Sequence, residues 1–254
     1  MANGRFVSNL ALDSTQGPAA SASGGVSAIT RIHAPFYNSN TPSTEWGQRF
    51  GQQVQLLGAE QLRPHFPVEN GKLIFYGSEP REFEENMAKK LLPLVRLGLH
   101  RDVRAYFGRR QRKQMAISSP VPIIDQVFVA ALNMHAPNPY RTHVEIKTRF
   151  LLQAAYEATY LASCLRETKC LVLTLVGGGS FANPFLWIAS AIAKAHAKWS
   201  KLSQLQRVRL PIYALHGLSK GESIDRLVYD ALMAVGIPKA KIEIRRVNEK
   251  HFKM

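Results

Sequence analysis

Residues 170–187 read CLVLTLVGGGSFANPFLW, and this stretch predicts a strand, a glycine loop and a helix in succession. The apolar and β-branched residues 171–176 are typical of a buried strand. Gly177, Gly178 and Gly179 follow, and a backbone without Cβ atoms can turn its amides toward an anion. A helix over 184–198 would direct its positive N-terminus to the same place. The pattern fits either a phosphate-binding loop or a tight turn that binds nothing.

The charge of the chain points to acidic partners. The 254 residues, of which 46% are hydrophobic, suffice for one large domain or two small ones with a sizeable core. The formal net charge of +15 and the isoelectric point of about 10.1 are far from those of an ordinary globular protein. Nucleic acid is the commonest acidic partner of such a chain, and an anionic membrane surface is the alternative.

Several kinds of motif are missing from the sequence. It shows no zinc-ligand spacing, no apolar run of membrane-spanning length and no apolar core of a secretory signal. We therefore expect an intracellular protein without a metal, a cofactor or a transmembrane segment. Residues 1–33 are poor in acids and rich in Ser and Ala, which leaves a mitochondrial address open beside a cytoplasmic one. The two cysteines, Cys164 and Cys170, are expected to be reduced core residues.

Strand-like and helix-like patterns alternate along the chain, which predicts an α/β protein with a mixed, largely parallel sheet. The predicted helices cover 44–62, 82–98, 146–166, 184–198 and 223–235. The predicted strands cover 73–76, 123–132, 171–176, 208–215 and 241–247. Gly98 is the expected end of the second helix. The third helix is expected to turn a set of apolar residues inward: Phe150, Leu151, Ala154, Ala155, Ala158 and Leu161.

Three segments resemble macrodomain-like proteins. Residues 151–192, LLQAAYEATYLASCLRETKCLVLTLVGGGSFANPFLWIASAI, resemble the C-terminal half of that fold. Residues 13–32, DSTQGPAASASGGVSAITRI, are similar to the first glycine-rich segment of a divergent branch. IIDQVFVAAL at 123–132 is similar to the strand between the two loops. The resemblance implies a single domain over 1–254, built as a three-layer α/β/α sandwich, with a weakly matched basic insertion at 34–120 and a basic C-terminal tail.

The resemblance also implies that two loops hold a diphosphate, as in proteins that bind ADP-ribose or its derivatives. The ligand-binding residues that it implies are Thr15, Gln16, Gly17, Pro18, Ala19, Gly177, Gly178, Gly179, Ser180, Phe181, Ala182 and Asn183. Phe181 would flank a ribose or plug the core beneath the loop. Asn183 is expected to cap the helix that begins near Pro184. Two departures stand against a complete pocket, because only residues 1–12 precede the first segment and no adenine-selecting aspartate can be placed.

No set of residues predicts catalysis. Asp13, Asp125, His135 and His143 lie near predicted strand ends or in irregular segments, without a recognisable pairing, and each is also a common type of turn or cap residue. No nucleophile elbow and no P-loop lysine accompany the glycines. We therefore assign no catalytic residue, and an enzyme built on this chain would resemble an ADP-ribosyl hydrolase.

Two functions follow from these patterns. The first is a non-catalytic module that binds ADP-ribose or a related nucleotide diphosphate through the two loops. The second is a degenerate macrodomain-like scaffold that acts as a basic, RNA-contacting subunit of a ribonucleoprotein, such as an organellar ribosome. The residues expected to contact nucleic acid are Arg96, Arg101, Arg104, Arg109, Arg110, Arg112, Lys113, Lys194, Lys198, Lys201, Arg245 and Arg246. A solvated basic surface is the alternative interpretation of these charges.

Overall fold

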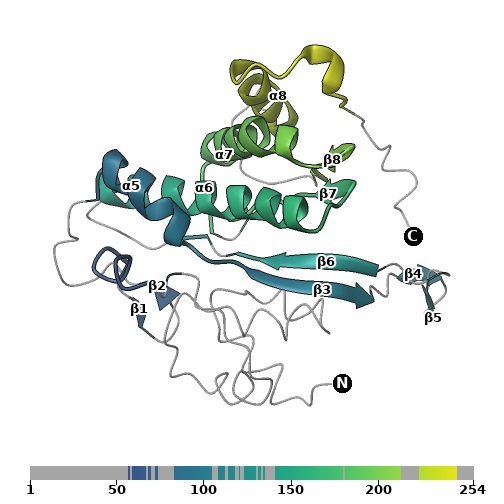
Figure 1. Cartoon of the computed structure of the whole chain (residues 1–254). Helices are drawn as coiled ribbons and strands as arrows, with labels where there is room; N and C mark the ends of the chain where they lie inside the picture. Colours follow the sequence, from purple (N-terminus) through teal and green to yellow (C-terminus); the bar gives the residue numbers. More distant parts are fainter. Residues whose placement is uncertain are drawn as a thin grey trace.

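The long helix α6 (Arg141–Leu165) lies at the centre of the described fold (Figure 1). The structure is a computed structural model. It describes residues 57, 59–66, 68–69, 72–73, 83–104, 108–111, 114–117, 120, 123–129, 131–132, 134, 141–179, 181–212 and 223–244. Within these residues the chain is a mixed α/β protein.

The C-terminal half repeats strand and helix, as the sequence predicts. Strand β7 (Cys170–Val172) leads through the glycine loop to α7 (Phe185–Trp199) and a short 3₁₀ turn, η2 (Ser200–Leu202). Strand β8 (Arg207–Arg209) then pairs in parallel with β7, so that α7 is the crossover between two parallel strands. Helix α8 (Ile224–Ala234) and the 3₁₀ turn η3 (Lys239–Lys241) follow, and α7 packs against both α6 and α8 (Figure 1).

The other described strands form antiparallel pairs. Strand β1 (Val68–Glu69) pairs with β2 (Lys72–Leu73), and β4 (Gly108–Gln111) pairs with β5 (Gln114–Ile117). The longest pair joins β3 (Gly98–Arg104) to β6 (Ile123–Phe128), which lies beneath α6 in Figure 1. Among the described residues, the parallel pairing that we expected is therefore confined to β7 and β8.

Two element boundaries differ from the sequence prediction. Instead of one helix over 82–98, the chain forms α5 (Glu85–Leu91) and a 3₁₀ turn, η1 (Leu92–Leu94). Pro93 lies within η1, and its missing amide prevents the α-helix from continuing. Gly98 consequently begins β3 and does not end a helix.

The ends of several other predicted elements also differ. Strand β7 ends at Val172 and β8 at Arg209, so residues 173–176 and 210–212, expected in strands, form none. Residues 242–244, expected in a strand, form neither strand nor helix after η3. Strand β6 ends at Phe128 and not at residue 132. Turns occupy 60–65 in place of the expected end of a helix, and residues 44–56 lie outside the described residues.

The core has two parts, and α6 contributes to both. In the first, Phe66, Phe83 and Phe150 pack together with ring centroids 5.2 to 5.4 Å apart. In the second, Tyr156 and Tyr160 pack with Leu173 of the β7 side and Ile188 and Ile192 of α7. The aromatic rings bury large apolar areas, which stabilises the packing of α6 on its neighbours.

The inward face of α6 is close to the one predicted. Phe150, Leu151, Ala154 and Ala155 are buried as expected. Leu161 was expected to point inward, but its side chain is 37% exposed because Tyr160 and Ala162 occupy the buried stripe at that turn. Ala158 is half-buried.

Candidate functional site

The glycine loop lies between β7 and α7, and its first two glycines are required by close packing. Gly177 has a φ of +75°, and a Cβ atom there would lie 2.8 Å from the Cβ atom of Ala131. A Cβ atom on Gly178 would lie 2.7 Å from the ring of Phe185 and 3.0 Å from Ile188. Larger residues would therefore force the loop away from its neighbours and from α7.

Gly179 differs from the two glycines before it. It is exposed, and no atom lies within 4 Å of a Cβ atom built on it. Its amide donates no hydrogen bond to an acceptor among the described residues, although its carbonyl accepts one from Ala182 at 2.9 Å. Packing does not require a glycine at this position.

Most other amides of the loop already have acceptors within it. The bonds are Val176 N to Thr174 O (3.0 Å), Gly178 N to Leu175 O (3.0 Å), Ala182 N to Gly179 O (2.9 Å) and Asn183 N to Gly177 O (2.9 Å). These internal bonds favour a loop that holds its own shape over one whose amides all point to an anion.

We expected Asn183 to cap α7, but it does not. Pro184 is the N-cap, and no side chain caps the helix. The buried Asn183 side chain instead donates from Nδ2 to the carbonyl oxygens of Leu132 at 2.7 Å and Phe181 at 3.1 Å. The side chain thereby ties the loop to the segment that follows β6, and its Oδ1 atom is buried without a partner among the described residues.

Phe181 is half-buried and packs against the second part of the core. Its carbonyl oxygen also accepts a hydrogen bond from the amide of Met134 at 2.8 Å. These contacts correspond to the core plug that we weighed against a ribose contact. The first loop (Thr15, Gln16, Gly17, Pro18 and Ala19) and Ser180 lie outside the described residues.

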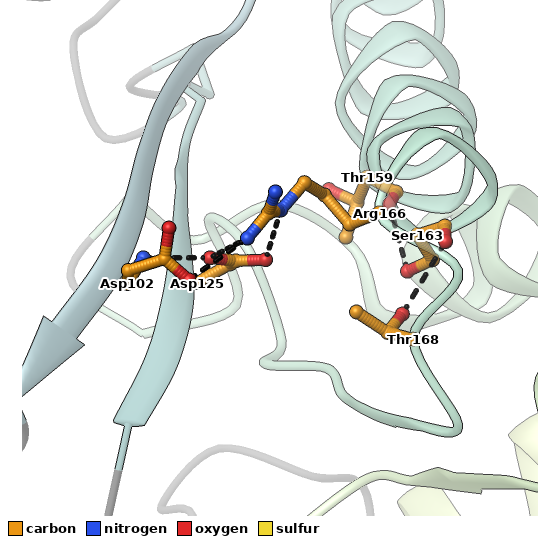
Figure 2. Close-up of polar contacts among 6 residues, drawn as sticks. All are labelled: Asp102, Asp125, Thr159, Ser163, Arg166 and Thr168. Atoms are coloured by element: carbon orange, nitrogen blue, oxygen red, sulfur yellow. Dashed lines mark hydrogen bonds and ion pairs between the residues drawn. The ribbon is translucent and has the colours of Figure 1, made fainter.

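Asp125, one of the acidic residues considered for catalysis, belongs to an ion-pair junction (Figure 2). The guanidinium of Arg166 donates from Nε to Asp125 Oδ2 at 2.8 Å and from Nη2 to Asp102 Oδ1 at 2.9 Å. Asp102 has a φ of 56° where the β3–β6 register shifts, and its amide donates to Asp125 Oδ1 at 2.9 Å.

The junction explains Asp125 without a catalytic role. The hydrogen bond from Arg166 holds the pKa of the Asp125 carboxyl below its usual value. The carboxylate therefore joins the β3–β6 pair to the end of α6, where Figure 2 shows Arg166 reaching toward both strands. Asp13 and His135 lie outside the described residues, as does the side chain of His143.

The predicted nucleic-acid contacts are only partly described. Arg96, Arg101, Lys194 and Lys201 are exposed. For Arg104, Arg109 and Arg110 the structure describes the strand backbone and not the side chain. Arg112, Lys113, Arg245 and Arg246 lie outside the described residues.

Lys198 has a structural partner, whereas Lys194 on the same helix has none among the described residues. The Lys198 ammonium group lies 2.6 Å from Glu157 Oε2 and 4.9 Å from the ring centroid of Trp199. The Glu157 side chain is 7% exposed and also accepts hydrogen bonds from Gln153 and Trp199. Burial raises the pKa of Glu157, but these three hydrogen bonds outweigh it and lower the pKa below its usual value. The charge of Lys198 therefore serves the packing of α6 on α7.

Three exposed bases that the sequence did not predict as contacts lie on or next to the β7–β8 pair: Lys169, Arg207 and Arg209. The alternation R-V-R in 207–209 is typical of a strand with arginines on one face, and it could have revealed two of them. Cys170 was predicted to be a core residue, but it is exposed on the same strand pair, and Cys164 is half-buried. Both cysteines are free thiols.

The part of the chain that the structure describes contains neither a membrane-spanning helix nor a cluster of metal ligands. None of its helices combines the length and apolar character needed to cross a bilayer. This part of the chain also contains no group of three or more His, Cys, Asp or Glu side chains that could hold a metal ion.

No family model, curated protein or solved structure matches this chain. The macrodomain-like resemblance therefore stays a prediction.

Proposed function

We propose that this protein is a basic scaffold that binds intracellular RNA through its phosphates. The observation that carries the proposal is the unequal use of acidic and basic side chains. Five acids of the described residues take part in ion pairs within the fold, Glu145 with Arg149, Asp102 and Asp125 with Arg166, Glu157 with Lys198, and Asp230 with Arg226, whereas Glu60, Glu84, Glu85 and Glu167 are exposed without one. Other bases are exposed and have no ion-pair partner in this part of the chain: Lys169, Lys194, Lys201, Arg207, Arg209 and Lys239.

Exposed Lys and Arg side chains of this kind are better suited to contact the phosphate groups of RNA than its nucleobases. Arg and Lys that contact phosphates release counterions, which gives affinity without sequence readout. A scaffold within a ribonucleoprotein needs this kind of binding, because assembly fixes its position on the RNA. The formal net charge of +15 agrees with such a role in the cytoplasm or in mitochondria.

Titration of the full chain with a fluorescent single-stranded RNA at several salt concentrations tests the proposal. We expect binding whose log affinity falls linearly with log salt, by roughly 0.7 for each phosphate contacted. Polyglutamate at equal charge serves as the control polyanion. Absence of RNA binding at about 0.1 M salt, or an affinity that salt leaves unchanged, would contradict the proposal.

A second candidate, binding of a nucleotide diphosphate such as ADP-ribose, is supported by Gly179. Gly179 is exposed, has open space around its Cα atom and precedes in sequence the N-terminus of α7, which favours anions. This candidate requires that the chain forms the predicted three-layer macrodomain-like sandwich and that the first loop completes the pocket.

Calorimetric titration with ADP-ribose tests this candidate, and Gly179→Glu is the informative variant. Gly178→Glu would be misleading, because that position is buried against Phe185 and Ile188 and the change would disturb the fold. We expect binding at micromolar concentrations that Gly179→Glu abolishes while the melting temperature stays the same. Absence of heat with the unchanged protein would exclude the candidate.

A further inference from the structure

The paired strands β7 and β8 have one covered face and one exposed face. Leu171 and Val208, which are partners in the parallel register, are half-buried and pack against the second part of the core. The residues on either side of them are exposed on both strands. Side chains of a strand alternate between its faces, so the exposed residues share the face turned away from the core. This outer face consists of Cys170, Val172, Arg207 and Arg209.

The outer face has the composition of a phosphate contact. Arg207 and Arg209 lie two residues apart on one strand, with Cα atoms roughly 6.6 Å apart at the usual strand rise. Both are partners of uncharged residues in the register, Cys170 and Val172, so no acid on β7 neutralises them. Lys169 precedes β7, and its carbonyl oxygen accepts hydrogen bonds from the amides of Gln206 and Arg207. The backbone of a third base therefore lies beside that of the first arginine.

We propose that the outer face of β7–β8 is a contact surface for the RNA backbone, an inference that rests on the proposed function. The planar guanidinium groups of Arg207 and Arg209 can each donate two parallel hydrogen bonds to a phosphate. The face offers no aromatic ring on which a base could stack, so it holds the backbone without reading the sequence.

An acidic protein fits this surface less well than RNA does. Protein interfaces are built around a buried apolar centre, and Val172, 57% exposed, is the large apolar side chain of this face. A chain of phosphates needs no such centre, because counterion release supplies the affinity. Charge complementarity therefore favours a polyphosphate backbone as the occupant.

The double variant Arg207→Ala/Arg209→Ala tests the surface, and Lys89→Ala/Lys90→Ala on α5 is its matched control. Both remove two exposed charges from the full chain and leave the described ion pairs intact. Against a single-stranded oligouridylate, we expect the arginine variant to lose roughly ten-fold in affinity and about 1.4 in salt slope. The control should lose less than about three-fold. Equal losses would mean that only net charge matters and would overturn the surface assignment.

Alkylation of Cys170 gives a second test on the unmodified protein. Its thiol is exposed on the outer face, whereas Cys164 is half-buried elsewhere and provides an internal reference. Saturating oligouridylate should slow alkylation of Cys170 several-fold without changing that of Cys164. Unchanged alkylation despite bound RNA would overturn the inference while leaving the proposed function intact, and equal protection by polyglutamate would assign the face to acidic protein. If the unmodified chain does not bind RNA at all, the proposed function itself fails.

Discussion

The hydroxyl of Tyr156 accepts a hydrogen bond from the amide of Val176 at 3.0 Å, immediately before the glycine loop. The same hydroxyl donates to the carbonyl oxygen of Thr174 at 2.8 Å. The Tyr156 ring is 1% exposed, and burial raises the pKa of its hydroxyl above the usual value, so the group stays protonated. One side chain of α6 thus holds residues 174–176, which connect β7 to the glycine loop.

We expect Tyr156→Phe to lower the free energy of unfolding by about 0.5–1.5 kcal/mol, because the amide of Val176 and the carbonyl oxygen of Thr174 lose the hydroxyl and keep only their bond to each other, while the core keeps its ring. Urea unfolding followed by circular dichroism measures the change. Thr159→Ser is the control, because its hydroxyl can still donate to the carbonyl oxygen of Ala155. A Tyr156→Phe protein as stable as the unchanged one would show that the hydroxyl does not hold the loop.

The glycines of the loop should respond differently to alanine. Gly177→Ala combines a φ of +75° with a contact at 2.8 Å, so we expect a loss of roughly 1–3 kcal/mol. Gly179→Ala meets open space, and we expect a change within about 0.5 kcal/mol. Thermal melts of the two variants test the contrast. Equal melting temperatures would contradict the packing that we describe for Gly177.

Substitutions of Lys198 and Lys194 should differ in their effects on stability and on RNA affinity. Lys198→Met leaves the buried Glu157 without its cationic partner, so we expect a loss of about 1–2 kcal/mol in the free energy of unfolding and little change in RNA affinity. Lys194→Met removes an exposed charge without a described partner and should leave stability within about 0.5 kcal/mol. Unfolding curves and RNA titrations of both variants provide the comparison. If Lys198→Met lost RNA affinity and kept its stability, the charge of Lys198 would be a contact for RNA and not a partner of Glu157.

His196 should make stability depend on pH. Its Nδ1 atom lies 2.9 Å from the Tyr160 hydroxyl, and burial, with a smaller contribution from the charge of Lys241, lowers the pKa of the imidazole below 6.5. In the unfolded chain the imidazole therefore binds its proton first as the pH falls. Its contribution to stability is complete above pH 6.5 and is lost as the pH falls from there toward the folded pKa.

His196→Gln is the matching variant, because its amide oxygen can still accept from Tyr160 but does not titrate. The unfolding free energy of the unchanged protein should fall more steeply than that of the variant between about pH 7 and pH 5. Parallel curves for the two proteins would show that His196 is not the group responsible.

Local patterns along the chain predicted the order of α6, β7, α7, β8 and α8, although they did not predict the strand ends. The apolar spacing before residue 166, the run at 171–176 and the glycines placed α6, β7 and α7 in the right order. Periodicity and glycine chemistry act over a few residues, so they can be recognised without knowing what packs against them. Gly98 shows the limit of such patterns, since a glycine after a helix-like run can end a helix or begin a strand.

Partners distant in the chain depended on the tertiary structure. Arg166 pairs with Asp102 and Asp125, and Lys198 pairs with Glu157, across sequence separations that no local pattern covers. These pairings gave Asp125 and Lys198 structural partners. The sequence likewise predicted Asn183 as a helix cap, whereas its side chain donates a hydrogen bond to the carbonyl oxygen of the distant Leu132.

The sequence by itself determined the large positive charge, the strand-loop-helix around Gly177 and the inward stripe of α6, because each follows from composition or from short-range spacing. The tertiary structure decided which charges remain exposed, which glycines are required and which face of β7–β8 is open. Burial and pairing are properties of residues brought together from different elements, so they arise only when the helices pack on the strands.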